Sequence, residues 1–173
     1  MLTVETLSGE EAAPYRDDVL AIWGAAFGPV EDPDGWRISP WDSHRNRAGY
    51  RLAIAQERGR LLGFAWGYTG ERGQYWPDLI AREAGSDVEG WIGGHFEFVE
   101  LAVLPEARRR GIGGRLHEAL LSGLPHARAL LATSDRADDP AVRLYSSVGW
   151  TSLGSYGEGR QVMGLRLDQR TGP

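Results

Sequence analysis

The residues from 101 to 114 are Leu101-Ala102-Val103-Leu104-Pro105-Glu106-Ala107-Arg108-Arg109-Arg110-Gly111-Ile112-Gly113-Gly114. An apolar strand ends at a proline, three arginines follow, and glycines open what we expect to be a helix. Amide N–H groups at a helix start favour an anion, and glycine lets the backbone approach that anion closely. Arginines add charge-assisted hydrogen bonds. The segment therefore predicts a loop that binds pyrophosphate.

This loop matches neither of the two common nucleotide-binding motifs. A P-loop requires a lysine, and the chain contains none. The dinucleotide fingerprint requires a third glycine at another spacing and an acidic residue after the next strand, and both are missing. Taken alone, the loop also has a simpler interpretation, an ordinary helix start beside a solvated run of arginines.

The composition excludes several classes of chemistry. The chain has 173 residues, which fits one domain, and it has a net charge of −5 and no Cys. Lysine-based covalent catalysis, disulfides and a cysteine nucleophile are therefore excluded. The acidic balance argues against general nucleic-acid binding. No apolar run reaches 18 residues and the N-terminus does not resemble a signal peptide, so we expect no membrane association and a cytoplasmic location.

The hydrophobic pattern predicts a mixed order of strands and helices. We expect strands at 3–6, 52–54, 62–68, 95–103, 129–133, 150–156 and 161–167, and helices at 14–27, 77–84, 112–120 and 140–148. Asp139 is expected to cap the last helix, with Pro140 at its first position. Residues 29–47 are expected to form a loop with a short helix. Because several strands are adjacent, the pattern favours an α+β fold with helices on both faces over a doubly wound parallel sheet.

Residues 70–94 form a long connection that contains six glycines and the aromatic residues Tyr75, Trp76 and Trp91. It has two interpretations, a binding loop or a segment whose aromatics cap the core. For Trp36, Trp41 and Trp66 among others, packing is favoured over stacking on a ligand.

The four histidines predict no metal site. His44, His95, His117 and His126 lack the spacing of metal ligands. His95 and Glu97 share a strand face and offer two ligands without a third. His117 is expected at the surface of its helix.

Two motifs together resemble the GCN5-related N-acetyltransferase (GNAT) family. Arg108 to Gly113 resembles the family's Arg/Gln-x-x-Gly-x-Gly/Ala loop for acetyl-CoA. Ala141-Val142-Arg143-Leu144-Tyr145, followed by Gly149-Trp150, resembles its Ala-x-x-Leu-Tyr-x-x-x-Gly-Phe segment. The resemblance spans roughly residues 50–167. It implies one acetyltransferase domain over residues 1–173, with variable acceptor-side helices in 1–50 and a cofactor-binding core in 95–150. It also implies a mostly antiparallel sheet of about seven strands whose fourth and fifth strands splay apart around the cofactor.

The resemblance implies that acetyl-CoA is the cosubstrate and assigns residues to it. The backbone of the strand before the loop would pair with the pantetheine arm and the thioester carbonyl, and the loop amides would hold the pyrophosphate. Asp138 stands where the family often has Asn, and an ionised Asp can only accept hydrogen bonds; it either contacts the cofactor differently or caps the helix. The implied cofactor-binding set is Leu101, Ala102, Val103, Arg108, Arg109, Arg110, Gly111, Ile112, Gly113, Gly114, Asp138, Ala141 and Tyr145.

The resemblance also implies residues that move protons. Tyr145 resembles the family's tyrosine that protonates the departing thiolate; the alternative is a core tyrosine. Glu97 and Glu100 are candidates for the base that takes the amine's proton, with Glu97 preferred, or else they are structural carboxylates. Strand alternation puts the two on opposite faces unless a bulge intervenes.

These residues imply direct acetyl transfer from acetyl-CoA to a primary amine of a small molecule or a peptide. Without Cys, no acyl-enzyme is expected. Two alternatives stay open, a non-catalytic acyl-CoA-binding sensor and an RNA-directed acetyltransferase, which would need a local basic face. Whether the chain forms a homodimer also stays open.

Overall fold

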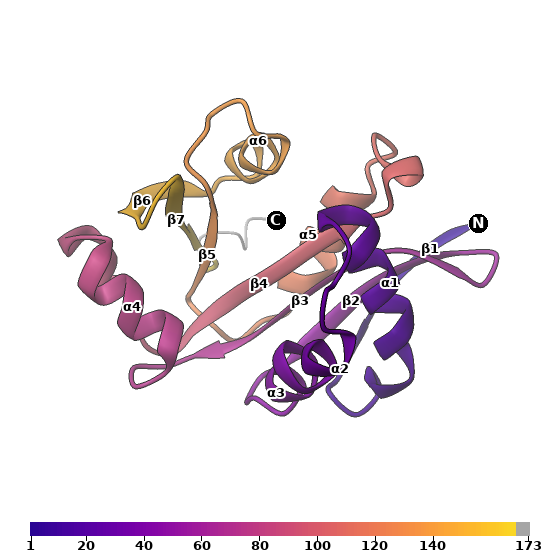
Figure 1. Ribbon diagram of the computed structural model, residues 1–173. Coiled ribbons are helices and arrows are strands. Elements are labelled where there is room, and N and C mark those ends of the chain that lie inside the picture. The colour runs from indigo at the N-terminus through magenta and orange to yellow at the C-terminus, as the bar shows by residue number, and fades with distance from the viewer. Residues whose placement is uncertain (169–173) are drawn as a thin grey trace. The chain divides into compact units, whose positions relative to one another are not determined.

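The computed structural model describes residues 1–168 and contains one seven-stranded sheet in the order β1-β2-β3-β4-β5-β7-β6 (Figure 1). The strands are β1 Leu2–Leu7, β2 Arg51–Glu57, β3 Arg60–Gly70, β4 His95–Val103, β5 Arg128–Ser134, β6 Thr151–Tyr156 and β7 Arg160–Arg166. The pairs β1/β2, β2/β3, β5/β7 and β6/β7 are antiparallel, whereas β4 and β5 are parallel. The expected α+β fold with a mixed, mostly antiparallel sheet is confirmed.

The helices follow the expected order, with more helix before β2 than the sequence predicts. They are α1 Arg16–Phe27, α2 Pro33–Trp36, α3 Ser43–Arg45, α4 Tyr75–Glu83, α5 Ile112–Leu121 and α6 Pro140–Ser147. Short turns η1 Ala13–Tyr15, η2 Arg37–Asp42, η3 Ser86–Trp91 and η4 Pro105–Ala107 connect them. The extra helix arises because Asp32 caps α2 by accepting from the Gly35 amide, and because Trp36 and Trp41 are buried. Within residues 1–168, no helix is long and apolar enough to cross a bilayer.

The chain divides into two compact units. Unit 1 comprises residues 1–68 and 99–123, and unit 2 comprises residues 69–98 and those from Leu124 onward.

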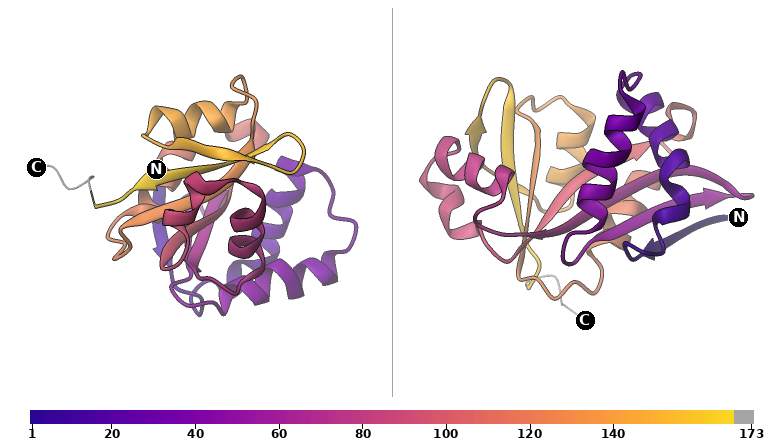
Figure 2. Two further views of the ribbon diagram at one scale, coloured as in Figure 1. Left: turned by 90° about the vertical axis from the view of Figure 1, so that its left-hand side faces the viewer. Right: turned by 60° about the horizontal axis from the view of Figure 1, so that its bottom comes forward.

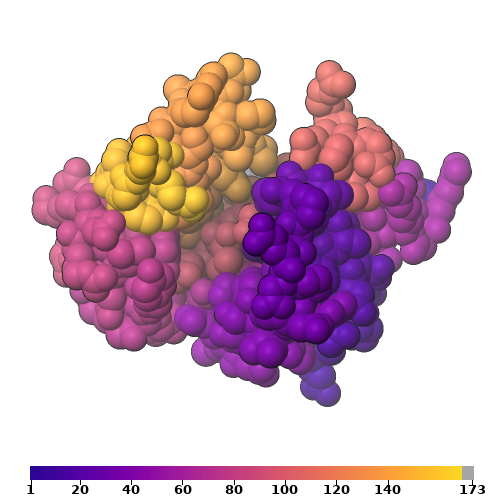
Figure 3. Space-filling model, viewed as in Figure 1, coloured from indigo at the N-terminus to yellow at the C-terminus, as the bar shows by residue number. Residues whose placement is uncertain are grey.

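An aromatic cluster fills one face of the sheet in unit 1. Trp66 is fully buried, and its ring stacks on Trp23 of α1 with centroids 5.7 Å apart and on Phe64 at 5.2 Å. Trp36 and Trp41 also contact Trp66, so α1 to α3 cover this face, as the indigo and violet surface in Figure 3 shows. The packing interpretation of Trp36, Trp41 and Trp66 is confirmed.

Helix α5 packs on the other face of the sheet in unit 1. A Cβ on Gly63 of β3 would lie 3.0 Å from a methyl group of Leu116, so the helix and the strand are in close contact. The Thr6 hydroxyl of β1 donates to the Ala119 carbonyl at 3.3 Å.

Residues 70–94 build a cover for the sheet of unit 2. Ile80 of α4, Val88 of η3 and Ile92 are buried against Leu130 of β5 and Val162 of β7. Trp76 and Trp91 pack against this cluster, and the Arg166 guanidinium lies 4.4 Å from the Trp91 ring centroid. Helices α4 and α6 lie on opposite faces of the β5–β7–β6 sheet (Figure 2). The core-capping interpretation therefore describes Trp76 and Trp91, whereas Tyr75 is exposed.

Two neighbouring aspartates at the start of α6 have different partners. The Asp139 carboxylate accepts from the Ala141 amide at 2.8 Å, so the expected N-cap is confirmed. Asp138 instead pairs with Arg136 through two bonds of 3.1 and 2.9 Å, in an exposed position. The alternative in which Asp138 caps the helix is wrong, because the cap is the residue directly before Pro140.

We expect Asp139→Ala to destabilise the fold and Asp138→Ala to leave it nearly unchanged. Loss of an N-cap costs about 1 kcal/mol, whereas the ion pair of Asp138 is exposed to solvent, which screens it, and contributes little to stability. Free energies of unfolding from urea titrations of both variants and the native chain measure this. Equal losses in the two variants would contradict the assignment of the cap.

The imidazole of His44 gives unit 1 a dependence on pH. The Trp66 indole N–H donates to His44 Nδ1 at 3.3 Å. Burial, helped by the charge of Arg47, lowers the pKa of His44 to about 4. Because this value lies below the ordinary 6.5, the neutral ring contributes stability that is present above about pH 6.5 and is lost as the pH falls towards 4.

His44→Asn should therefore lose less stability than the native chain between pH 7 and pH 4.5. Asn keeps an acceptor for the indole and does not titrate. Unfolding free energies at the two pH values, compared as a difference between the chains, isolate His44 from the carboxylates. Parallel losses in both chains would show that the half-buried ring of His44 does not carry the effect.

Candidate functional site

The glycine loop leaves backbone amides available at the start of α5. Arg109 and Gly111 have positive φ angles of 59° and 74°, which turn the chain into the helix. The Arg115 amide donates to the Gly111 carbonyl at 3.2 Å, so the amides of Ile112, Gly113 and Gly114 precede the helical ladder. No side chain caps them. This arrangement suits an anion, as the sequence predicts.

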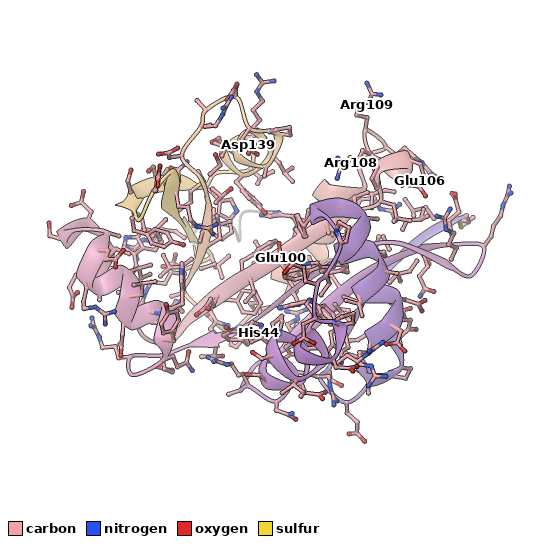
Figure 4. The ribbon with its side chains drawn as sticks, in the orientation of Figure 1. His44, Glu100, Glu106, Arg108, Arg109 and Asp139 are labelled. Carbon is pink, nitrogen blue, oxygen red and sulfur yellow. The ribbon has the colours of Figure 1, made fainter. Side chains whose placement is uncertain are left out.

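Two of the three arginines in the loop hold the loop itself. The Arg108 Nε donates to the Val103 carbonyl at 3.3 Å, and the Arg110 guanidinium donates to Glu57 of β2 at 2.9 Å. That contact is the main reason why the pKa of Glu57 lies below its ordinary value. Arg109 projects outward from the loop (Figure 4). Its guanidinium is therefore the one not already engaged with a strand in the described part of the chain.

Strand β4, which precedes the loop, forms only a short ladder with β5. The parallel ladder between β4 and β5 contains two residue pairs, Phe96 with Ala129 and Glu97 with Leu130. On its other edge, β5 pairs with β7 along its whole length. In unit 1, Leu101 and Val103 of β4 are half-buried, Ala102 is buried, and the Leu104 amide donates to the Leu62 carbonyl at 2.9 Å.

The two candidate bases differ in burial. Glu97 is 6% exposed, and Glu100, labelled on β4 in Figure 4, is half-buried. In unit 2, the Glu97 Oε2 lies 3.8 Å from His95 Nε2, and His95 is fully buried. A Cβ on Gly70 of β3 would lie 2.2 Å from His95 Nε2 and 2.9 Å from Glu97 Oε2, so both side chains face this glycine. The His95 and Glu97 pair was visible in the sequence, whereas Gly70 was not.

Tyr145 lies on the buried face of α6. Its ring is 7% exposed and makes contacts with Phe98 of β4 and Trp150, each with centroids 5.9 Å apart. Ala141 is half-buried one turn earlier, and its amide is held by Asp139. The ring therefore packs as a core tyrosine does, while its hydroxyl belongs to the motif that the sequence singled out.

The expectation that His117 lies at the surface is wrong, because α5 buries a wider face than the periodicity indicates. His117 is 1% exposed, and Leu116, Leu120 and Leu121 of the same helix are also buried. No group of three or more His, Asp or Glu side chains within residues 1–168 is placed to hold a metal ion.

Comparisons with known proteins agree on one family. A family model described as the acetyltransferase (GNAT) family matches residues 16–150. A GCN5-like protein acetyltransferase of Mycobacterium tuberculosis is 34% identical over 79% of this chain and 81% of its own. A mycothiol acetyltransferase of Thermobispora bispora is 30% identical over 80% of this chain, which spans 44% of that protein. An acetyltransferase of Salmonella typhimurium, solved with acetyl-CoA, superimposes with a TM-score of 0.62 at 18% identity, covering 100% of this chain and 98% of that one.

Proposed function

Because the chain belongs to the acetyltransferase (GNAT) family, we propose that it transfers the acetyl group of acetyl-CoA directly to a primary amine. Membership makes it an acetyl-CoA-dependent acyltransferase. The observation that carries the finer proposal is the buried carboxylate of Glu97 on β4, because an amine acceptor needs a group that takes its proton.

The residues of the glycine loop fit a pyrophosphate. The amides of Ile112, Gly113 and Gly114 precede the helical ladder, and the helix dipole adds partial positive charge at the same place. Arg109 is exposed and projects outward from the loop, so that its guanidinium can add positive charge for the pyrophosphate. Arg108 and Arg110 also support the conformation of the loop through Val103 and Glu57, and each guanidinium has further N–H donors for the phosphates. The backbone of Leu101, Ala102 and Val103 is assigned to the pantetheine arm and the thioester carbonyl. Asp138 is not placed in this set, since it pairs with Arg136.

Glu97 is assigned the proton of the acceptor amine. An alkylamine with a pKa of about 10.4 is protonated at pH 7, and its deprotonation there costs roughly 4 to 5 kcal/mol. A carboxylate that takes this proton directly or through water supplies the neutral amine that attacks the thioester. Glu100 is the second candidate, on the part of β4 that belongs to unit 1.

Tyr145 is assigned the proton of the leaving thiolate. Phenols titrate near pH 10 and thiols near 8.5, so the transfer runs slightly uphill and its contribution is about 10²-fold. The contacts of the ring with Phe98 and Trp150 fix the direction of the hydroxyl. Because the chain has no Cys, we assign no acetyl-cysteine intermediate to the reaction.

A panel of amines tests the proposed function. The net charge of −5 favours a cationic acceptor, and the Mycobacterium tuberculosis relative is named for protein acetylation, so a lysine peptide with a free N-terminus leads the panel. Spermidine, an aminoglycoside and free amino acids follow. We expect thiol release from acetyl-CoA and one acetyl group on an amine nitrogen. Binding of acetyl-CoA without turnover on any amine would favour a sensor instead.

Gly113→Val should weaken CoA binding by at least about tenfold, because a branched side chain stands where the backbone meets the pyrophosphate. Calorimetric titration with CoA measures the affinity. Gly24→Ala in α1 is the control, since its Cβ would meet nothing within 4 Å; it should stabilise α1 by up to about 1 kcal/mol and bind CoA normally. Normal CoA affinity in Gly113→Val would move the pyrophosphate to another place.

Tyr145→Phe should lower kcat by about 10²-fold while CoA affinity changes less than about tenfold. The ring and its packing remain, and only the hydroxyl is lost. Turnover and CoA affinity are measured on the same variant, with the panel amine that the native protein acetylates fastest. An unchanged kcat would remove Tyr145 from the catalytic set.

A further inference from the structure

We propose that His95 is a positioning residue: its Nε2–H, placed across the bare Cα of Gly70, orients the Glu97 carboxylate. This inference rests on the proton-accepting role proposed above for Glu97. It assigns a task to a fully buried imidazole that the transfer chemistry itself does not use.

The hydrogen bond on the other side of the ring sets its protonation. The Gly93 amide donates to His95 Nδ1 at 3.1 Å, so that nitrogen carries a lone pair. A neutral imidazole has one acceptor and one donor nitrogen. The ring proton is therefore on Nε2, the atom that faces Glu97.

The Gly93 amide is itself fixed by a network within unit 2. Arg128 of β5 donates to the Trp91 carbonyl at 2.9 Å and to the Gly93 carbonyl at 2.6 Å. Glu71 accepts from the Gly94 amide at 3.1 Å. Residues 91–94 thus hold the His95 ring in one orientation. The long connection before β4 both covers the sheet and positions this histidine.

His95 Nε2 and the Glu97 carboxylate both face Gly70, because a Cβ at that residue would lie close to each of them. His95 Nε2 is buried without a hydrogen-bond partner at normal distance in the described chain, and Glu97 Oε2 lies 3.8 Å away. A buried donor without an acceptor lowers the stability of the fold. Catalytic hydrogen bonds are, however, often long before the substrate binds. A methyl group at residue 70 would overlap both side chains, which explains the glycine.

Four other titratable side chains of unit 2 have contacts of their own. His126 Nε2 lies 2.8 Å from the Thr69 hydroxyl, and its ring packs on Phe96. Because Phe96 stands between His95 and Glu97 in the strand, it points to the opposite face, and His126 is on that face. Tyr145 packs on Phe98, while Arg128 and Glu71 hold the backbone of residues 91–94. His95 is therefore the histidine on the same strand face as Glu97.

Two substitutions of His95 separate its two nitrogens. Asn retains an acceptor for the Gly93 amide and loses the donor towards Glu97, whereas Gln retains a donor at the distance of Nε2. His126→Asn is the matched control on the opposite face. Gly70→Ala tests the clearance, with Gly90→Ala as its control, because a Cβ at residue 90 would meet nothing within 4 Å.

Carbon-13 NMR can follow the titration of the Glu97 carboxyl group, whose signal is identified by its absence in Glu97→Gln. This measurement requires no acetyl acceptor. Loss of the donor disfavours the carboxylate, so its titration midpoint should rise by about half a pH unit in His95→Asn. It should return towards the native value in His95→Gln and stay native in His126→Asn. Nitrogen-15 spectra of the native chain should show His95 protonated on Nε2. An unchanged midpoint in His95→Asn, or a proton on Nδ1, overturns the proposal.

Kinetics distinguish this proposal from the proposed function. With the fastest panel amine, the acid limb of kcat/KM should move to higher pH in His95→Asn, which lowers kcat/KM about threefold at pH values well below the midpoint of the limb, and His95→Gln should restore it. In a Glu97→Gln background, His95→Asn should have no further effect. If Glu97→Gln leaves the acid limb of the pH profile unchanged, the assignment of Glu97 as the base fails. If Glu97→Gln abolishes the limb but His95→Asn leaves it as in the native chain, only the role of His95 is refuted.

Discussion

The parallel ladder between β4 and β5 ends after two residue pairs, and much of the proposed chemistry depends on that limit. Backbone N–H and C=O groups in a protein interior need partners, so a strand edge without a ladder is a place for another polar chain. Strand β4 is otherwise a regular core strand, with Phe96 and Phe98 fully or almost fully buried. Its unusual feature is that buried aromatic residues alternate with a buried histidine and a buried glutamate.

The loop after β4 shows how charge can serve conformation and ligand together. Three consecutive arginines in an acidic chain look like one positive patch. The structure divides their work, because Arg108 and Arg110 reach back to β4 and β2 and Arg109 projects outward. Glycine at 111 supplies the positive φ that a residue with a side chain adopts at a cost. As a result, the amides of residues 112–114 lie before the first hydrogen bond of the helical ladder of α5.

The sequence predicts the local features well because their causes are local. Strand 95–103, the Asp139 cap and the start of α5 follow from alternation, capping chemistry and glycine, all within a few residues. The ion pair between Arg110 and Glu57 joins residues that are 53 apart, and no short pattern announces it. His117 was misplaced because helical periodicity does not show how much of α5 the sheet covers. The clearance at Gly70 likewise depends on the neighbouring strand, so the His95 and Glu97 pair could be seen in the sequence while its setting could not.

The affinity of the native chain for a series of CoA fragments tests the central claim, that the amides at the start of α5 hold a pyrophosphate. Calorimetry compares acetyl-CoA, its form without the 3′-phosphate, and S-acetylpantetheine, which has no phosphate. Hydrogen bonds to a charged group contribute roughly 1.5 to 3 kcal/mol each. We predict that S-acetylpantetheine binds at least about 10²-fold more weakly than acetyl-CoA, while loss of the 3′-phosphate alone costs less than about tenfold. Equal affinities for acetyl-CoA and S-acetylpantetheine would contradict the account.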